Sequence, residues 1–364
     1  MKNFTFYFNL TLIIVLLSFT NCNNTKNKEK NSPVNSTQVN TPPDTTDRTN
    51  DFYDDAVTNN LPMSKLSIAG EIENPSDIDF SNLPLHSVIV KEALLDGKGN
   101  KFIGAYRYDG YSLYDILNLM KLKKANEKEF RPIIDLYVTI ENNKGEKVIL
   151  SWGEIYYPYH LHEIIIAKQV TRIVPSKTKD LWPLPTECKL IVCTDLVTER
   201  NISMPSKITV KSYKKSFKTV KGLKPLYSPK IDLYDNNKLV NTLTGISDTF
   251  KNEVYSTIFY GRGRGIHSTT PFTGVMLKNI LAPYAELSQK NIRTGTYLVV
   301  AKDGYRCVYS FSELMNRNDQ AEVLLMCNPK LKDDGIFKVF SACDFFSDRA
   351  VKGITSIYFS NNED

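Results

Sequence analysis

The residues best equipped for chemistry lie together between Gly261 and Thr270, in the sequence GRGRGIHSTT. Glycine lets the backbone approach a ligand closely and adopt positive φ, and arginine offers a planar fork of donors that suits phosphate or carboxylate. Successive backbone N–H groups can add a concave anion site. The pattern predicts a site for an anionic ligand, and the alternative is a tight glycine turn with solvated arginines. The candidate contacts in this loop are Arg262, Arg264, His267, Ser268 and Thr269.

The same loop matches no nucleotide-binding or catalytic signature. Ile266 stands where the third glycine of G-x-G-x-x-G belongs, and the chain contains no P-loop sequence. Ser268 follows His267 directly, but sequence neighbours rarely adopt the geometry of a catalytic triad. The sequence therefore names no catalytic residue, and whether the protein is an enzyme stays open.

A second polar group is the segment His160-Leu-His162-Glu163, which follows several tyrosines. If the segment is extended, both imidazoles lie on one face, where they could begin a zinc or copper site. No cysteine or further histidine lies close in the sequence to complete such a site. The sequence therefore predicts no metal site, and the tyrosines fit either an exposed contact surface or packing.

The elements that must position the glycine-arginine loop occur twice in the chain. Phe272–Leu281 lines up with Tyr108–Leu117: an aromatic residue, glycine two later, leucine five later, Asp or Asn seven later, then Ile-Leu. At the place of the Gly261–Thr270 loop, the first copy has only the short turn Asp96–Asn100. Any ligand contact specific to the second copy should therefore lie in the loop.

Further blocks repeat in the same order. Each copy contains an expected hairpin that ends in Ser-aromatic-x-Glu, at Ser151 in the first copy and at Ser310 in the second. Each copy also has a strand that ends in aspartate, followed five residues on by arginine. We expect each of these Asp–Arg pairs to form a structural salt bridge or turn. The pairs are Asp195 with Arg200 and Asp344 with Arg349.

The N-terminal residues are typical of an export signal. A lysine is followed by the apolar run Leu10–Phe19 and by Cys22, and the run is too short for a comfortable membrane span. Leu17–Cys22 resembles a loose bacterial lipobox, although Asn21 departs from the usual Gly or Ala. We therefore expect lipidation of Cys22 and a location in the cell envelope, anchored to a bacterial membrane and either periplasmic or surface-exposed. Ordinary cleavage and secretion is the alternative.

Composition divides the rest of the chain. Residues 1–22 are the expected signal, 23–61 a polar tether, 62–213 the first domain, 214–230 a lysine-rich linker and 231–361 the second domain. The tether has too few apolar residues to offset the entropy of ordering. The net charge is +6 and much of the excess lysine is local, so no nucleic-acid partner is expected.

Four short blocks carry a family resemblance. They are the opening Ile68–Pro75, the aromatic-x-Gly corner, the hairpin that ends in Ser-aromatic-x-Glu, and the closing strand-Asp-x4-Arg. With them, each copy resembles the oxidoreductase molybdopterin-binding domain of the sulfite oxidase superfamily. The resemblance covers both copies and implies an α+β fold of β-rich mixed sheets with short helices. It also implies a pterin cofactor held by loops at one rim, which the closing block borders, so Arg349 becomes a further candidate contact.

The chain departs from that family at the metal ligand. A cysteine at the end of the second strand ligates molybdenum there, and the corresponding positions fall near Ala93 and Phe259. Neither side chain replaces the thiolate that a soft, high-valent metal needs. We therefore expect the metal chemistry to be lost from both copies.

These observations predict a membrane-anchored lipoprotein that binds an anionic or pterin-like ligand, or a protein partner, without catalysis. The residues establish no cofactor, and molybdopterin follows only from the resemblance. One alternative is a molybdopterin-dependent oxidoreductase whose metal is held only by the cofactor's dithiolene. Another is a surface adhesin whose domains act as spacers or docks. If Cys22 is lipidated, an odd number of cysteines remains, and a Cys327–Cys343 disulfide stays possible in principle.

Overall fold

The computed structural model describes residues 57–97, 99–175, 177–330 and 335–361. These residues belong to one compact unit of the chain. The expected signal, Cys22 and most of the tether lie outside the described residues. No helix within the described ranges is long and apolar enough to cross a membrane.

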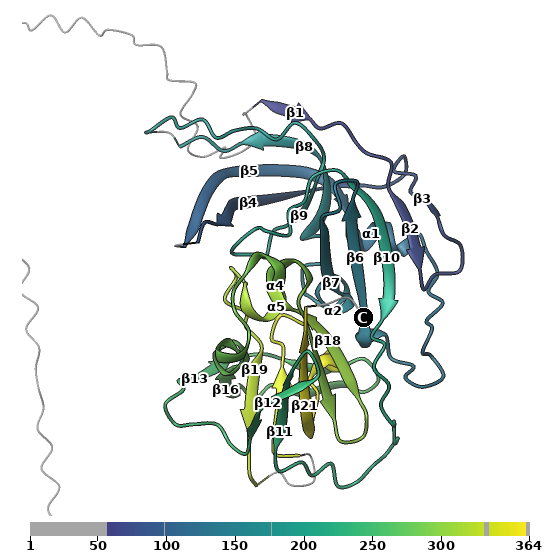
Figure 1. Cartoon of the computed structure of the whole chain (residues 1–364), viewed down its shortest axis with the longest axis vertical. Helices are drawn as coiled ribbons and strands as arrows, with labels where there is room; N and C mark the ends of the chain where they lie inside the picture. The colour runs from purple at the N-terminus through teal and green to yellow at the C-terminus, as the bar shows by residue number, and fades with distance from the viewer. Residues whose placement is uncertain (1–56, 98, 176, 331–334, 362–364) are drawn as a thin grey trace, which may run out of the picture. The chain divides into compact units, whose positions relative to one another are not determined.

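The fold is β-rich, with several mixed and antiparallel sheets and a few short helices (Figure 1). In the first copy, one sheet has the order β3 (Ser76–Asp77), β2 (Ser67–Gly70), β10 (Pro205–Ser212), β6 (Leu136–Asn142) and β7 (Lys147–Ser151). Its other sheet has the order β1 (Thr58–Asn60), β8 (Ile164–Arg172), β5 (Asn100–Ser112) and β4 (Leu85–Leu95), and β9 (Lys189–Val192) also pairs with β8.

The second copy repeats both sheets. The mixed sheet has the order β12 (Lys238–Leu243), β11 (Ile231–Asp235), β21 (Ile354–Ser360), β17 (Thr296–Ala301) and β18 (Arg306–Ser310). The antiparallel sheet has the order β13 (Asn252–Tyr255), β16 (Phe272–Met276), β19 (Leu324–Cys327) and β20 (Phe337–Phe340). A separate hairpin consists of β14 (Phe259–Gly261) and β15 (Gly265–Ser268).

Strand direction and helix positions repeat as well. β10 is parallel to β2 and antiparallel to β6, and β21 is likewise parallel to β11 and antiparallel to β17. The helices are α1 (Leu113–Asn118), α2 (Trp152–Tyr156), α3 (Leu277–Leu281), α4 (Gln289–Thr294) and α5 (Phe311–Met315), with 3-10 turns η1 (Ile133–Asp135), η2 (Ala282–Tyr284) and η3 (Ser347–Arg349). α1 corresponds to α3, and α2 to α5. The repeat read from the sequence is thus visible in strand order, strand direction and helix position.

The Ser-aromatic-x-Glu motif forms the start of a short helix in both copies. Ser151 Oγ accepts a hydrogen bond from the backbone N–H of Glu154, whose carboxylate accepts one from the N–H of Ser151. Ser310 Oγ likewise accepts from the backbone N–H of Glu313. Such caps satisfy backbone donors that a helix start leaves unpaired. They explain why both hairpins end in a helix at this residue.

Both Asp–Arg pairs form salt bridges, one of the two arrangements expected from the sequence, and both are buried. Each arginine also contacts a second carboxylate. Arg200 is fully buried and bonds the carboxylates of Asp195 and Glu154. Arg349 is also fully buried and bonds those of Asp344 and Glu313. Each arginine therefore ties the loop before the last strand to the glutamate of the Ser-aromatic-x-Glu motif in its own copy.

These networks also cross from one copy to the other. Ser151 Oγ donates to Glu313 Oε2 over 2.7 Å, and Arg200 Nη1 donates to Ser310 Oγ over 3.1 Å. Gly153 lies against Arg349, because a Cβ at this glycine would come within 2.3 Å of Nη1. The helix starts of the two copies therefore share one buried polar junction, which we call the junction network: Ser151, Glu154, Asp195, Arg200, Ser310, Glu313, Asp344 and Arg349.

Two boundaries can be compared with the sequence-based expectations. Residues 214–230, the expected linker, contain no strand or helix. The end of the expected tether differs, because Thr58–Asn60 forms β1 along β8 and Leu61 is buried. Pairing at a sheet edge uses backbone groups, so a strand can form here despite polar side chains.

We predict that Arg349→Met lowers the free energy of unfolding by about 3–5 kcal/mol, because it leaves two buried carboxylates without their cation. Urea unfolding measures the change. The matched control is Lys121→Met, which removes a pair with Glu73 whose side chains are 77% and 41% exposed. That change should cost about 0–1 kcal/mol. Equal losses in the two variants would contradict a structural role for the junction network.

Candidate functional site

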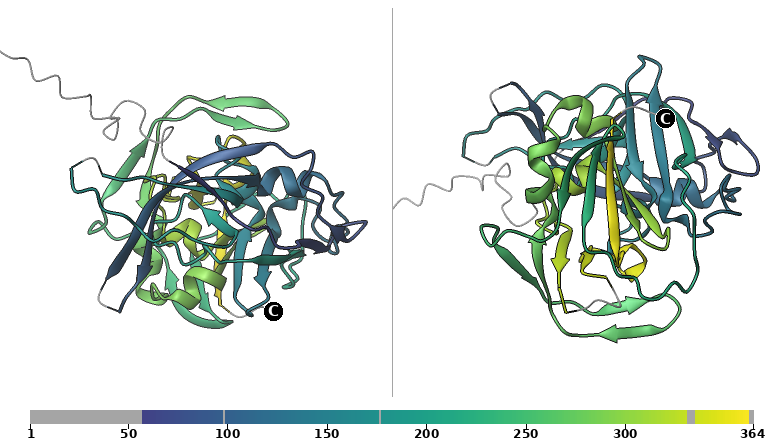
Figure 2. Two further views of the ribbon diagram at one scale, coloured as in Figure 1. Left: turned by 90° about the horizontal axis from the view of Figure 1, so that it is seen from above. Right: turned by 60° about the horizontal axis from the view of Figure 1, so that its bottom comes forward.

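The glycine-arginine loop is a β-hairpin. β14 and β15 pair through Tyr260 with Ile266 and Gly261 with Gly265, and Figure 2 shows this green hairpin at the edge of the molecule. Gly265 has φ +70°, which favours glycine at the turn. The imidazole of His267 lies over Gly261, where a Cβ would come within 2.3 Å of Nε2. Two of the glycines therefore serve the hairpin itself.

One of the two hairpin arginines, Arg262, already has partners elsewhere in the protein. Arg262 donates to the Tyr157 hydroxyl over 2.6 Å and pairs with Asp348 at 2.9 Å. Its guanidinium also lies over the rings of Tyr157 and Phe346. An anionic ligand would have to compete with Asp348 for this cation.

The other predicted contacts divide into two groups. Arg264, His267 and Thr269 are exposed on the hairpin, and Ser268 Oγ accepts from the backbone N–H of Thr270. Arg349 lies inside the molecule in the junction network. Tyr157 lies between the hairpin and the junction network, since Arg262 and Arg349 both lie near its ring. The structure thus brings five of the six predicted residues together and places Arg349 apart, away from solvent.

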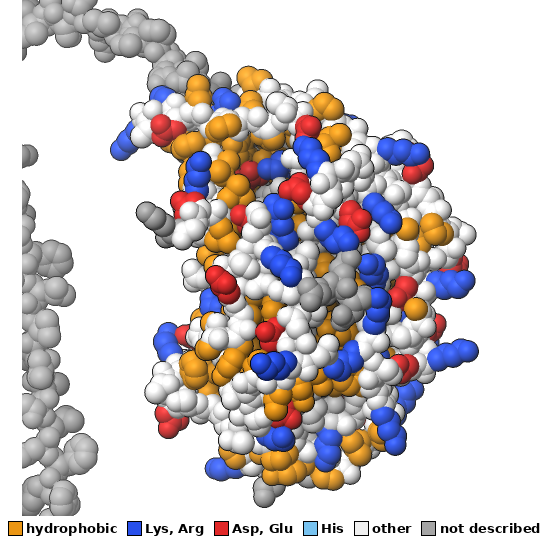
Figure 3. All heavy atoms as spheres, viewed as in Figure 1, with side chains coloured by type: hydrophobic (Ala, Val, Ile, Leu, Met, Phe, Trp, Pro, Cys, Tyr) orange, Lys and Arg blue, Asp and Glu red, His pale blue; other side chains and the backbone are white. Residues whose placement is uncertain are grey.

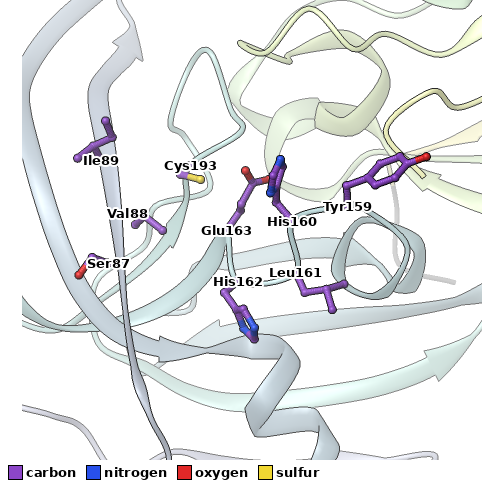
Figure 4. A pocket seen from close by; sticks show the side chains of 9 residues that line it. All are labelled: Ser87, Val88, Ile89, Tyr159, His160, Leu161, His162, Glu163 and Cys193. Carbon is purple, nitrogen blue, oxygen red and sulfur yellow. The ribbon is translucent and has the colours of Figure 1, made fainter. Parts of the chain in front are cut away.

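A cleft of about 600 Å³ opens in the first copy (Figure 4). One wall is the edge strand β4, and the other is the segment between α2 and β8, with a cysteine that follows β9. It is lined by Ser87, Val88, Ile89, Tyr159, His160, Leu161, His162, Glu163 and Cys193. Hydrophobic side chains are also prominent on the side of the molecule where β4 and β5 lie, whereas basic and acidic side chains are interspersed over the face drawn in Figure 3.

The two histidines of the segment point in opposite directions (Figure 4). The sequence placed both imidazoles on one face only if the segment was extended. The structure has no regular strand at His160 or His162, so that condition is not met. His160 turns toward the carboxylate of Glu163. Burial raises the pKa of Glu163, and the neighbouring His160 opposes this shift. This part of the cleft therefore combines an imidazole with a carboxyl group that holds its proton more strongly than usual.

His162 instead joins residues that are distant in the sequence. Its ring stacks on that of His86, with centroids 3.8 Å apart and planes within 6°. Asp115 Oδ2 lies 2.8 Å from His86 Nε2 and 3.6 Å from His162 Nδ1. Burial lowers the pKa of His162, and the adjacent His86 lowers it further, while Asp115 acts in the opposite sense. We call this group the His-Asp-His cluster: His86, Asp115 and His162.

Sequence reasoning missed two members of this cluster. His86 lies on β4, where it pairs across the sheet with Gly110 of β5. Asp115 follows five residues later in the first turn of α1. Two sequence features could have revealed the cluster: the strand alternation of β4 and the aromatic-x-Gly corner. Together they place a β4 side chain near the start of α1.

The cysteines form no disulfide within the described residues, where Cys188, Cys193, Cys307, Cys327 and Cys343 are free. The Cys327–Cys343 pairing that the sequence left open is therefore absent from the structure. Burial raises the pKa of Cys307 and that of Cys343 to about 12. These thiols are held protonated at neutral pH.

We predict slow alkylation of Cys307 and Cys343 by iodoacetamide at pH 8 in the native protein. The thiolate is the nucleophile, and a pKa near 12 leaves about one thiol in ten thousand ionised at this pH. Mass spectrometry of peptides before and after unfolding in guanidinium measures the difference. Rapid modification of the native protein would contradict this packing.

The unfolded protein also reports on the N-terminus. The chain has 6 cysteines, and lipidation of Cys22 would leave only the five others to react. Protein isolated from a bacterial membrane should therefore gain five groups on alkylation. A sixth group would show that Cys22 is a free thiol.

Comparison of the chain with protein-family models and with curated proteins finds no match. Function must therefore be inferred from the chemistry of the described residues. The features available are the cleft beside β4, the His-Asp-His cluster next to it, and the β14–β15 hairpin.

Proposed function

We propose that the protein is a membrane-anchored binding protein of the bacterial cell envelope that holds a small ligand in the cleft beside β4 without catalysis. The cleft carries this proposal. Its volume of about 600 Å³ falls within the ~300–1,000 Å³ usual for small-molecule sites. Its lining joins apolar side chains, Val88, Ile89 and Leu161, to polar ones.

The lining favours a flat ligand that carries polar or anionic groups. Tyr159 is among the residues that line the cleft, is 50% exposed and offers a ring for stacking. His160 can donate a hydrogen bond to an acceptor of the ligand, and Glu163 presents a carboxyl group beside it. A pterin-like ring or a small aromatic acid has this chemistry, and these are the ligands we propose.

We further propose that the two copies descend from domains of the molybdopterin-binding type. The repeated combination of a mixed sheet with an antiparallel sheet supports this origin. The residues at the expected metal position do not fit a molybdenum centre. The N–H and C=O of Ala93 both bond to Thr198, and Phe259 packs on Phe272 and Phe340.

This misfit weighs against the oxidoreductase alternative. Neither Ala93 nor Phe259 carries an oxygen, nitrogen or sulfur atom in its side chain, so no protein ligand reaches a metal from these positions. An oxidoreductase would need a cofactor held without a protein ligand to its metal. A binding role needs no such ligand, and it is therefore the function we prefer.

A thermal-shift screen with free pterins and small aromatic acids tests the cleft. A ligand at a hundred times its Kd stabilises a native protein by about 2.7 kcal/mol, so the unfolding midpoint of the wild type should rise. His160→Ala removes an exposed imidazole that lines the cleft and can donate a hydrogen bond to the ligand, and it should reduce the rise.

The matched control is the hairpin double variant Arg262→Ala/Arg264→Ala, which should keep the ligand-induced rise. The opposite pattern, with loss in the arginine variant and retention in His160→Ala, would move the ligand to the hairpin. The absence of any rise across the screen would contradict small-ligand binding.

A surface feature supports a second candidate, a protein-docking or adhesive role. Tyr260 and Ile266 pair across the hairpin, and Ile258 lies two residues before Tyr260. Tyr260 also contacts Phe345, which in turn contacts Tyr159. These five side chains are between 39% and 62% exposed. Exposed apolar patches of this kind mark interaction surfaces.

The docking role predicts that Tyr260→Ser/Ile266→Ser weakens attachment of cells that display the protein to a surface coated with extracellular proteins. Arg264→Ala serves as the control, because it changes an exposed residue of the same hairpin without removing apolar area. Unchanged attachment in the double variant would reject the hairpin as the docking surface.

A further inference from the structure

We infer that the His-Asp-His cluster of the first copy is a binding site for one divalent transition-metal ion of the zinc class. The three side chains come from β4, α1 and the segment before β8. Among the described residues, His86, Asp115 and His162 form a group of potential metal ligands that lie close enough together to hold one ion. One atom of each lies within 4.8 Å of the others.

The distances suit a single ion. Bonds of about 2.0–2.1 Å in a tetrahedral site put ligand atoms roughly 3.3 Å apart. Asp115 Oδ2 lies 2.8 Å from His86 Nε2 and 3.6 Å from His162 Nδ1, values that bracket this spacing. Small movements of the three side chains would therefore equalise the distances.

One movement can be specified. The lone pairs of parallel imidazoles do not converge, and the rings of His86 and His162 are stacked. His162 is the more exposed ring, with 38% of its side chain accessible against 24% for His86. We expect the ring of His162 to turn on metal binding, which exchanges its 3.0 Å hydrogen bond with Ser112 Oγ for a bond to the ion.

The donor set selects the class of ion. Two imidazoles with one carboxylate suit zinc and other first-row transition ions, whereas calcium and magnesium prefer oxygen ligands. Three protein ligands leave a further coordination position open. Because His162 also lines the cleft, that position can be filled by water or by a ligand from the cleft.

The corresponding positions of the second copy carry other residue types. His86 pairs with Gly110, and Glu253 pairs with Gly274 at the matching corner. Asn279 occupies the α3 position that matches Asp115 in α1. Ser112 and Met276 occupy matching positions, and they pair with Ile165 and Leu324. His162 lies three residues before Ile165, and Ala321 lies three residues before Leu324, so these two residues correspond. The corresponding set is therefore Glu253, Asn279 and Ala321, so the histidine ligands belong to the first copy alone.

The competing explanation is structural: the carboxylate of Asp115 accepts a hydrogen bond from His86 and fastens α1 to β4. Both roles predict some loss of stability on mutation, so stability cannot separate them. Direct metal binding does, because a hydrogen-bonded cluster without a metal role takes up no ion. The two remaining histidines of the chain, His160 and His267, provide matched controls.

The experiment titrates the EDTA-treated full-length protein with zinc ions by calorimetry. Co²⁺ serves as a second probe, because its visible absorption reports on coordination. We expect one zinc ion per wild-type chain. Asp115→Asn and His162→Ala, which introduce the residue types of the second copy, should each weaken binding at least tenfold. Loss of a metal ligand commonly costs more than loss of its supporting partner, which is worth about 10–100-fold.

His160→Ala and His267→Ala should bind zinc like the wild type. Thermal unfolding in EDTA checks that each variant is folded, and Asp115→Asn keeps one oxygen acceptor for His86. Wild-type protein that binds no stoichiometric zinc would overturn the inference, as would equal weakening in the His160→Ala control. The titration uses the ion alone, so its result does not depend on whether the cleft takes an organic ligand.

Discussion

The balance of charge in the junction network constrains the rest of the structure. Each copy buries one guanidinium against two carboxylates, Arg200 with Asp195 and Glu154, and Arg349 with Asp344 and Glu313. Each set therefore has one negative charge in excess. Burial accordingly raises the pKa of Asp195 and that of Glu313, although their arginines oppose the shift. Removing either arginine would leave uncompensated buried charge, which proteins tolerate poorly.

Hydrogen bonds across the junction network also make the copies depend on each other. The hydroxyl of Ser151 donates to Glu313 of the other copy, and Ser310 receives a bond from Arg200. Each serine caps a helix of its own copy at the same time. A helix cap, a salt bridge and an interface contact thus share one set of atoms. This sharing explains why both copies keep the motif although their loops differ.

The network positions the candidate sites through α2. Glu154 fixes the start of that helix, and its end leads into Tyr157 and the segment that lines the cleft. This segment is held by the second copy, since Tyr159 N–H donates to the carbonyl of Cys343 and the carbonyl of Tyr157 accepts from Phe345 N–H. Three residues beyond Tyr159, the same segment carries His162 into the His-Asp-His cluster. The second copy therefore supports a site whose ligands all come from the first.

Local sequence patterns determined much of the fold. The Ser-aromatic-x-Glu caps, the two hairpins and the Asp–Arg pairs lie within short stretches of chain, where spacing alone decides the contact. The repeat could be read for the same reason, because the matched blocks are local and keep their order. The extra loop of the second copy was also located from the sequence, at the place of the turn between β4 and β5, and the structure shows that it is the β14–β15 hairpin.

The tertiary structure decided the rest. Arg262 pairs with Asp348, a residue far along the chain, and Arg349 is buried. The positive charge of these two side chains therefore did not indicate whether a ligand could reach them. The tertiary structure also turned His160 and His162 apart, and strand pairing brought His86 and Asp115 to His162. The register of β4, β5 and β8 sets that cluster. Register depends on which strands pair across a sheet, and residue spacing along the chain does not reveal it.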